Sequence, residues 1–186
     1  LQAVVNRSFN MIDVDMDTST SDMVIVLANG TAGGEAIDKG HPAAEPLALA
    51  IETISIELAR ELARDGEGAR TLIEVVVEGA ASNDDARRTA RTISSSPLIK
   101  TMVTGRDPNW GRVLMAAGSS GATLKFENIR VWIGDHCTFE HSEPTAIAEE
   151  EISAAMDREE VQIRIDLGAG EARATAWGCD LTEEYV

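Results

Sequence analysis

Gly105-Arg106-Asp107-Pro108-Asn109-Trp110-Gly111-Arg112 joins two different kinds of predicted structure. The segment before it, 98–104 (Leu-Ile-Lys-Thr-Met-Val-Thr), is rich in β-branched and apolar side chains and predicts a strand. Beyond it, apolar residues recur at i, i+3, i+4 and i+7, and they are Trp110, Val113, Leu114 and Ala117. This spacing predicts a helix over 108–117 with one apolar face.

The junction itself has the chemistry of a helix start. Asp107 can accept hydrogen bonds from free amide groups, and Pro108 suits the first helical position, where its missing N–H costs nothing. Gly118 is the expected end of the helix. A helix N-terminus beside Asn109 and Arg112 could hold an anionic group, or it could be a structural turn with Trp110 in the core.

The clearest helix precedes this region and runs over 44–64. Its apolar stripe is predicted to face the core, and it consists of Leu47, Ala50, Ile51, Ile54, Leu58 and Leu62. Asp65-Gly66-Glu67-Gly68 follows, with Gly66 as the expected stop. Glycines on both sides of Glu67 allow close approach of the backbone, so this carboxylate could bind an ammonium group; the alternative is an exposed turn residue.

Two strands are predicted before that helix. Residues 10–17 alternate in polarity, which places Asp13, Asp15 and Asp17 on one face of a half-buried strand. These carboxylates could hold a hard metal ion, but their spacing along the strand makes a solvated strand face the better explanation. Residues 23–28 form a continuous apolar run, typical of a strand that is buried on both faces.

From residue 71 onwards, strands and helices alternate. We predict strands at 71–77, 126–139 (with a turn at Gly134-Asp135), and a hairpin of 161–167 with 172–177, separated by helices at 82–94 and 145–156. This order predicts an α/β or α+β layered fold with helices covering a sheet. We place a domain boundary near residue 70, with 1–70 and 71–186 as the two parts.

The composition excludes several function classes. Apolar residues make up 44% of the chain, enough for a packed core, whereas the net charge of −16 argues against nucleic acid or an anionic membrane as the main partner. No apolar stretch is long enough for a membrane span, and two cysteines without a scaffold pattern favour a reducing, cytoplasmic compartment. Both ends of the sequence resemble cut ends, so we expect a piece of a longer protein.

Residue patterns alone predict no catalytic set and no metal site. His136, Cys137 and His141 lie close in sequence, but their spacing does not match a closed zinc site and a fourth ligand is lacking. We find no nucleotide-binding loop either.

Four segments, in order, resemble the ornithine acetyltransferases of arginine biosynthesis, which include the bifunctional glutamate N-acetyltransferases. They are Arg7–Asn10 leading into Asp17-Thr18-Ser19-Thr20-Ser21-Asp22, Asp65-Gly66-Glu67-Gly68-Ala69, Gly105–Arg112, and Cys179–Val186. The sequence departs from the family pattern at two places. Ser21 replaces the family's usual Asn, and Arg70-Thr71 stands where Thr-Lys is usual. These departures bear on fine specificity.

The resemblance implies a self-cleaving precursor whose new N-terminal threonine is the nucleophile. That threonine would take an acetyl group from N-acetylornithine and pass it to glutamate, and bifunctional members also use acetyl-CoA as a co-substrate, with no resident cofactor. The implied fold is part of an αββα sandwich of the N-terminal-nucleophile type, plus a smaller α/β domain with ferredoxin-like alternation over 71–186. The implied partner is the α chain of the same precursor, in an α2β2 or larger assembly.

The resemblance also assigns roles to residues. This chain resembles a β chain that lacks both of its ends, so no catalytic residue is expected in it; the nucleophile would lie roughly twenty residues before Leu1. Glu67 is the residue implied to bind the substrate amine by a charge-assisted contact. Asp17, Asp107 and Asn109 are expected to support the site.

Two other functions stay open. A self-cleaving amidase or aminopeptidase would hydrolyse its acyl-enzyme and would share the implied fold. A non-catalytic small-molecule-binding α/β domain is the second alternative, because the nucleophile is missing from the sequence.

Overall fold

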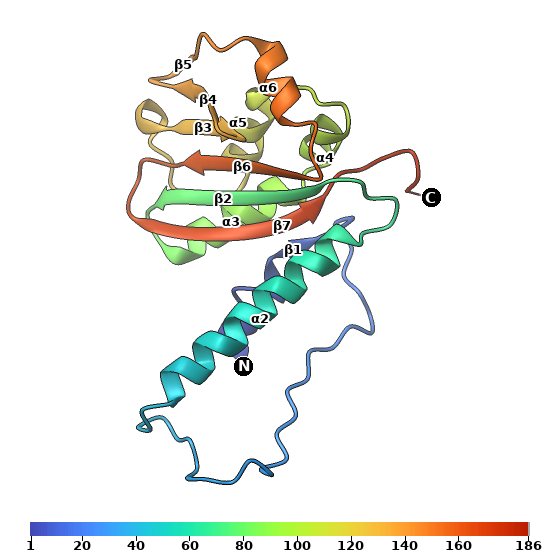
Figure 1. Cartoon of the computed structure of the whole chain (residues 1–186). Coiled ribbons are helices and arrows are strands. Elements are labelled where there is room, and N and C mark those ends of the chain that lie inside the picture. Colours follow the sequence, from blue (N-terminus) through green and yellow to red (C-terminus); the bar gives the residue numbers. More distant parts are fainter. Residues whose placement is uncertain (186) are drawn as a thin grey trace.

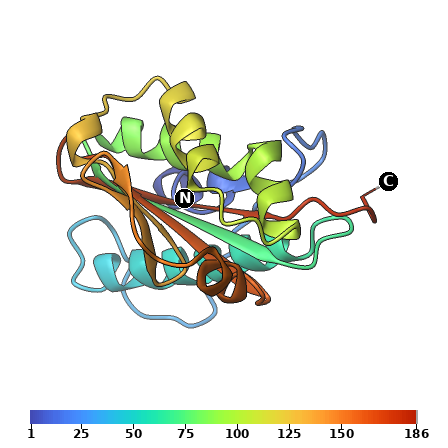
Figure 2. The same ribbon diagram turned by 90° about the horizontal axis from the view of Figure 1, so that it is seen from above.

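The computed structural model describes residues 1–185 and contains one seven-stranded mixed sheet, ordered β1-β7-β2-β6-β3-β4-β5. Helices α3, α4 and α5 cover one of its faces, whereas α2 and α6 lie on the other face and leave β2 and β6 open between them (Figure 1, Figure 2). The layered α/β prediction is therefore confirmed. The domain boundary near residue 70 stays a prediction, although β1, from the first part, pairs with β7, from the second.

The elements run along the chain in the following order and bounds. They are α1 (Gln2–Val5), a 3-10 turn (Phe9–Met11), β1 (Ile12–Asp13), α2 (Ala44–Arg64), β2 (Leu72–Ala80), α3 (Asn83–Ser94), α4 (Pro97–Thr104), α5 (Trp110–Ser119), a second 3-10 turn (Phe126–Asn128), β3 (Arg130–Ile133), β4 (His136–Glu140), β5 (Glu143–Pro144), α6 (Glu149–Ala155), β6 (Glu160–Asp166) and β7 (Ala172–Cys179).

One face of the central strands is apolar: Ile73, Val75 and Val77 of β2 are fully buried, as are Ile163 and Ile165 of β6. The alternate residues of the same two strands form the other face, which is mainly polar and partly exposed, and they include Glu74, Glu78, Glu160, Gln162 and Arg164. Helix α3 was predicted correctly, and its Ser82 side chain accepts a hydrogen bond from the Asp85 amide at 3.1 Å, as expected for an N-cap.

The predicted hairpin of 161–167 with 172–177 is wrong in its pairing. Both strands exist, but β2 lies between them, parallel to β6 and antiparallel to β7. The loop Leu167–Glu171 therefore crosses over β2 instead of making a tight turn. The hairpin of β3 and β4, with its turn at Gly134-Asp135, is confirmed.

Residues 97–104 form helix α4, so the predicted strand at 98–104 is wrong. Pro97 occupies the first turn, where it favours a helix, and Ile99, Met102 and Val103 recur at helical spacing and are buried. The hydroxyls of Thr101 and Thr104 donate hydrogen bonds to backbone carbonyls four residues earlier in the helix, so these β-branched residues are accommodated in it.

The junction after α4 also differs from the prediction. Arg106 adopts a left-handed conformation (φ 50°), and the Asp107 amide donates to the Met102 carbonyl at 3.0 Å, so this segment closes α4. Helix α5 then begins at Trp110 with Asn109 before it and no side-chain cap, and it ends at Ser119 and not at Gly118. The predicted cap by Asp107 is therefore wrong.

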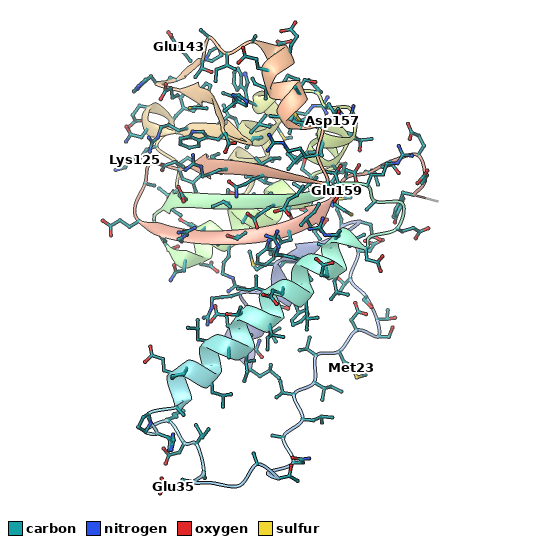
Figure 3. The ribbon with its side chains drawn as sticks, viewed as in Figure 1. Met23, Glu35, Lys125, Glu143, Asp157 and Glu159 are labelled. Carbon is teal, nitrogen blue, oxygen red and sulfur yellow. The ribbon has the colours of Figure 1, made fainter. Side chains whose placement is uncertain are left out.

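The N-terminal third of the chain is the least packed part. Only Ile12 and Asp13 of the predicted strand 10–17 pair with the sheet, and the apolar run 23–28 forms no strand with any residue of 1–185. Figure 1 shows residues 14–43 as a long loop that leaves the sheet and runs to the start of α2, which is the end of that helix farther from the sheet, and Figure 3 places Met23 and Glu35 on this loop, away from the sheet.

Helix α2 has its predicted bounds but presents the opposite face to the sheet. Small residues pack inward, with Ser55, Ala59 and Ala63 buried, whereas Leu58 and Leu62 are more than half exposed. None of the helices in residues 1–185 is both long enough and apolar enough to cross a membrane.

Candidate functional site around Glu67

Glu67 lies in a tight turn between the end of α2 and the start of β2. The Ala69 amide closes this turn on the Gly66 carbonyl at 3.0 Å, and Glu67 itself is exposed. The C-terminal segment runs beside this turn in both ribbon views (Figure 1, Figure 2). The side chain of Glu67 is thus exposed to solvent, whereas the backbone on either side of it is enclosed by other segments of the chain.

The two glycines that flank Glu67 are required by that enclosure. A Cβ at position 66 would lie 2.6 Å from the Cys179 sulfur, and a Cβ at position 68 would lie 2.5 Å from the backbone of Glu184. Gly68 also has a φ of 67°, which side-chain-bearing residues rarely adopt. The predicted close approach of the backbone is therefore present, and what approaches is the C-terminal segment.

That segment is attached to the Glu67 turn by three hydrogen bonds from two side chains. The carboxylate of Asp180, which is 3% exposed, accepts from the amides of Arg70 at 2.8 Å and Thr71 at 2.9 Å. The hydroxyl of Thr182 donates to the Gly68 carbonyl at 2.7 Å. These contacts fix where the turn sits relative to β7.

Negative charges act on Tyr185, in the C-terminal segment beside the Glu67 turn. The Tyr185 hydroxyl donates to Asp15 at 3.0 Å, and this hydrogen bond raises the pKa of the Tyr185 phenol. Partial desolvation and the charges of Asp15, Glu67 and Asp17 raise that pKa further. A cluster of this sign suits a cationic ligand such as a substrate ammonium group.

A buried lysine lies beneath this cluster. Lys100 is 2% exposed, and its Nζ donates to the carbonyls of Asp13 and Cys179 at 3.1 Å each, with the Asp13 carboxylate at 3.3 Å. It joins the ends of β1 and β7, the two strands that continue into Asp15 and Asp180. Because a buried charge is costly without partners, this lysine fixes both strand ends relative to α4.

The four predicted site residues do not gather in one place. Asp17 lies with Glu67 around Tyr185, whereas Asp107 pairs with Arg112 at 3.2 Å, and no hydrogen bond or ion pair within residues 1–185 links Asp107 or Asn109 to Glu67. The sequence patterns did not point to Lys100, indicated Asp15 only as a possible metal ligand on a strand face, and gave no role to Asp180 or Tyr185. The one available signal was the lysine that interrupts an apolar run at position 100.

Neither cysteine has the environment of a reactive thiolate. Burial raises the pKa of the Cys179 thiol, and it raises the pKa of the Cys137 thiol as well. Within residues 1–185, no three side chains of His, Cys, Asp or Glu are placed to hold a metal ion together.

Comparisons with known proteins agree with the residue patterns. The family model described as "ArgJ family" matches residues 1–186. The arginine biosynthesis bifunctional protein ArgJ of Symbiobacterium thermophilum is 50% identical over all of this chain, and that of Bacillus licheniformis is 44% identical. The chain spans 46% of the length of each of these relatives.

A solved structure is similar over the whole chain. The crystal structure of the arginine biosynthesis bifunctional protein ArgJ from Bacillus halodurans superimposes with a TM-score of 0.96 at 44% identity. The match covers 100% of this chain and 87% of the crystallised chain. With the family model and the relatives matching from end to end, this chain belongs to the ArgJ family.

Proposed function

We propose that this chain is one of the two chains of an acetyltransferase that moves the acetyl group of N-acetylornithine to glutamate through an acetyl-threonine enzyme. The relatives' names place them in arginine biosynthesis and call them bifunctional. Acetyl-CoA is then the second acetyl donor for glutamate. The enzyme works in the cytoplasm.

The observation that carries this proposal is the position of Glu67. A carboxylate in a glycine-flanked turn, with Asp15 and Asp17 nearby, offers a negative site for the substrate amine. In this mechanism Glu67 orients the substrate, and the threonine hydroxyl attacks the acetyl carbonyl with its own α-amine as base. The threonine and the groups that stabilise the oxyanion come from chain outside these residues.

The exposed apolar surface supports the proposed partner. Leu58 and Leu62 of α2 and Met23, Ile25 and Leu27 of the loop are each more than half exposed. Monomeric proteins rarely leave so many large apolar groups in water. We infer that the other chain of the precursor covers this surface, pairs with 23–28 as a strand, and supplies the second sheet of the αββα sandwich.

The lengths of the relatives support two chains as well. This chain spans 46% of the curated relatives but 87% of the crystallised chain, so that crystallised chain is itself about half the length of a curated relative. Two chains from one precursor account for this difference. Assembly as α2β2 is part of the same proposal.

Acetyl transfer by the whole gene product tests the function. We expect acetyl to pass from N-acetylornithine to glutamate, and Glu67→Gln to lower kcat/KM at least about tenfold, because a hydrogen bond to a charged group contributes ~1.5–3 kcal/mol. Glu143→Gln is the matched control, since this exposed glutamate lies at the far edge of the sheet (Figure 3).

The other outcomes separate the alternatives. Acetate release without transfer to glutamate would identify a hydrolase. A gene product without acetyl chemistry would contradict the proposed function. Equal rates for the Glu67 and Glu143 variants would contradict the role assigned to Glu67.

A further inference from the structure

A pocket of about 640 Å³ lies beside β7 and is lined by Arg173, Ala174, Thr175 and Trp177 of that strand. It exists because β1 pairs with β7 only at Trp177 and Gly178, so the rest of that β7 edge has no neighbouring strand among residues 1–185. Helix α1, the inward face of α2 and the start of α3 form the other walls. No residue of this pocket belongs to the cluster around Glu67.

The lining combines an apolar wall with arginines. The half-buried Ile56 and Ala174 supply apolar surface, whereas Met11 and Trp177 are only 1% and 3% exposed. Glu52 and Glu74 line the same space together with four arginines, namely Arg7, Arg60, Arg87 and Arg173. The whole chain has only 16 lysines and arginines and a net charge of −16. A quarter of its basic side chains therefore meet at one pocket of an acidic protein.

Three of these arginines have carboxylate partners. Arg7 binds both oxygens of Glu52, at 2.5 and 2.6 Å, and Arg60 contacts Glu74 and Glu160. Arg173 lies 3.9 Å from Glu78. Carboxylates of the same chain thus balance the charges of Arg7 and Arg60, and the more distant Glu78 balances that of Arg173 to a smaller degree.

Arg87 is the exception. It is half-buried on α3, and within residues 1–185 it makes no hydrogen bond and no ion pair. The remaining unpaired arginines of the described chain, Arg91 and Arg158, are exposed, where water satisfies them. Arg87 is therefore the half-buried arginine of residues 1–185 whose guanidinium has no hydrogen-bond or ion-pair partner.

The Nε atom of Arg87 makes this need specific. Only three buried side-chain polar atoms of residues 1–185 lack a hydrogen bond: the Asp13 Oδ1, the Ser94 Oγ and the Arg87 Nε. Asp13 Oδ1 lies 3.3 Å from the Lys100 ammonium, and Ser94 does not line the pocket. The Nε atom itself is inaccessible to solvent, but the Arg87 side chain lines the pocket, and its guanidinium has no partner within residues 1–185. Such a group is the complement of a carboxylate or phosphate, which a guanidinium binds with paired hydrogen bonds.

We propose that this pocket is a second ligand site, separate from the Glu67 site, for a small molecule with an anionic head and an apolar body. The head, a carboxylate or a phosphate, binds Arg87, and the body lies against Ile56 and Ala174. The pocket volume falls within the usual range of small-molecule sites, about 300–1,000 Å³. The Glu67 site is negative, so the two sites select ligands of opposite charge.

Binding to the complete gene product tests this site, with three probes that share a benzene ring. Benzoate carries a carboxylate, phenyl phosphate carries a phosphate, and benzamide carries no charge. Isothermal titration calorimetry is expected to show that at least one anion binds and that benzamide does not. Which anion binds more tightly identifies the head group.

The variant pair is Arg87→Gln and Arg88→Gln. Each substitution removes one positive charge from α3. Arg88, however, does not line the pocket and instead pairs with Asp85 at 2.6 Å and donates to the Gly121 carbonyl. We expect Arg87→Gln to weaken anion binding about tenfold or more, since it removes a charge-assisted contact, and Arg88→Gln to leave it unchanged. Equal affinities of the two variants, or no anion binding to the wild type, would overturn the proposal.

A measurement without substitutions covers the case in which Arg87→Gln does not fold. A crystal structure of the complete wild-type protein soaked with the tighter-binding anion should place the anionic head within hydrogen-bond distance of Arg87. A pocket filled by another part of the protein, or an anion bound elsewhere with the pocket empty, contradicts the proposal.

Discussion

Strand β2 and helix α2 are both rich in aliphatic residues, yet they differ completely in how those residues are buried. In β2, Leu72, Ile73, Val75 and Val77 are all inaccessible to water. In α2, the large apolar residues Leu49, Ile54, Leu58 and Leu62 are 52–63% exposed, and small residues face the sheet instead. One face of the sheet is packed as a core within this chain, whereas the outer face of α2 is exposed.

The difference shows which apolar residues are buried by this chain itself and which are left exposed on it. A helix with small residues inward can lie close to the sheet, and its large residues then point outward to a second layer. The loop before α2 has the same property, since Leu27 is 91% exposed. Both features fit a half-molecule whose second layer comes from the rest of the precursor.

The largest expected effect is loss of the assembly on changing the outer face of α2. Leu58→Asp with Leu62→Asp removes two apolar side chains that the partner would bury, about 3–6 kcal/mol of burial, and adds two charges. Native mass spectrometry of the gene product should show the two chains apart. Leu98→Asp, at a comparably exposed leucine on α4 (48%), is the control and should leave the chains together. An intact assembly in the double variant would show that α2 is not the interface.

A smaller effect is expected in the sheet. Ile163→Ala in β6 leaves a cavity at a fully buried position and should lower the free energy of unfolding by about 2–5 kcal/mol. Denaturant unfolding measures this loss, and Leu98→Ala at the surface should cost less than about 0.5 kcal/mol. Equal losses for the two would mean that the sheet core is not the stabilising centre.

The Glu67 turn should respond to Gly68→Ala. This residue combines a positive φ with backbone atoms of Glu184 2.5 Å from the new Cβ, so we expect a cost of about 1–3 kcal/mol and release of the C-terminal segment. Gly118→Ala is the control: nothing lies within 4 Å of its Cβ, and helix propensity should add about 0.5–1 kcal/mol of stability. Thermal melting of both variants, with limited proteolysis near residue 185, distinguishes the two outcomes.

The smallest effect concerns the pH dependence of the C-terminal segment. The chain has a single tyrosine, so ultraviolet absorbance of its phenolate follows Tyr185 alone when the chain is studied apart from its partner. Its pKa is raised in the folded state, first by the hydrogen bond to Asp15. This hydrogen bond therefore contributes at neutral pH and is lost as the pH rises through the raised pKa.

Asp15→Asn checks this assignment. The substitution removes the charged acceptor and should move the Tyr185 titration back towards the ordinary value of about 10. An unchanged midpoint would mean that Asp15 does not govern Tyr185 and that the negative cluster is looser than the hydrogen bond indicates.

Local signals in the sequence predicted much of the fold. The Ser82 cap with Asp84 and Asp85 in the first turn fixed α3, and the apolar run after Thr71 predicted β2. The strand prediction for 98–104 failed because β-branched composition outweighed the Ser96-Pro97 helix start. Pairing was harder, because no local feature of β6 or β7 reveals that β2 lies between them.

The orientation of α2 shows the same limit. Its helical period was evident, but a periodic apolar stripe cannot say whether it faces its own sheet or another chain. At the site, the glycines around Glu67 were informative because a close backbone approach needs them locally. Lys100, Asp180 and Tyr185 join the site through contacts between residues 79 to 170 positions apart, which no local pattern contains.

Hydrogen–deuterium exchange on the complete gene product tests the central claim most directly, namely that this chain is completed by the other half of its precursor. We expect the amides of 23–28 to exchange slowly, at rates comparable to those of β2, because a partner strand would bind them. Rapid exchange across 23–28, as in a solvated loop, would contradict the account and leave the apolar face of α2 without the partner proposed for it.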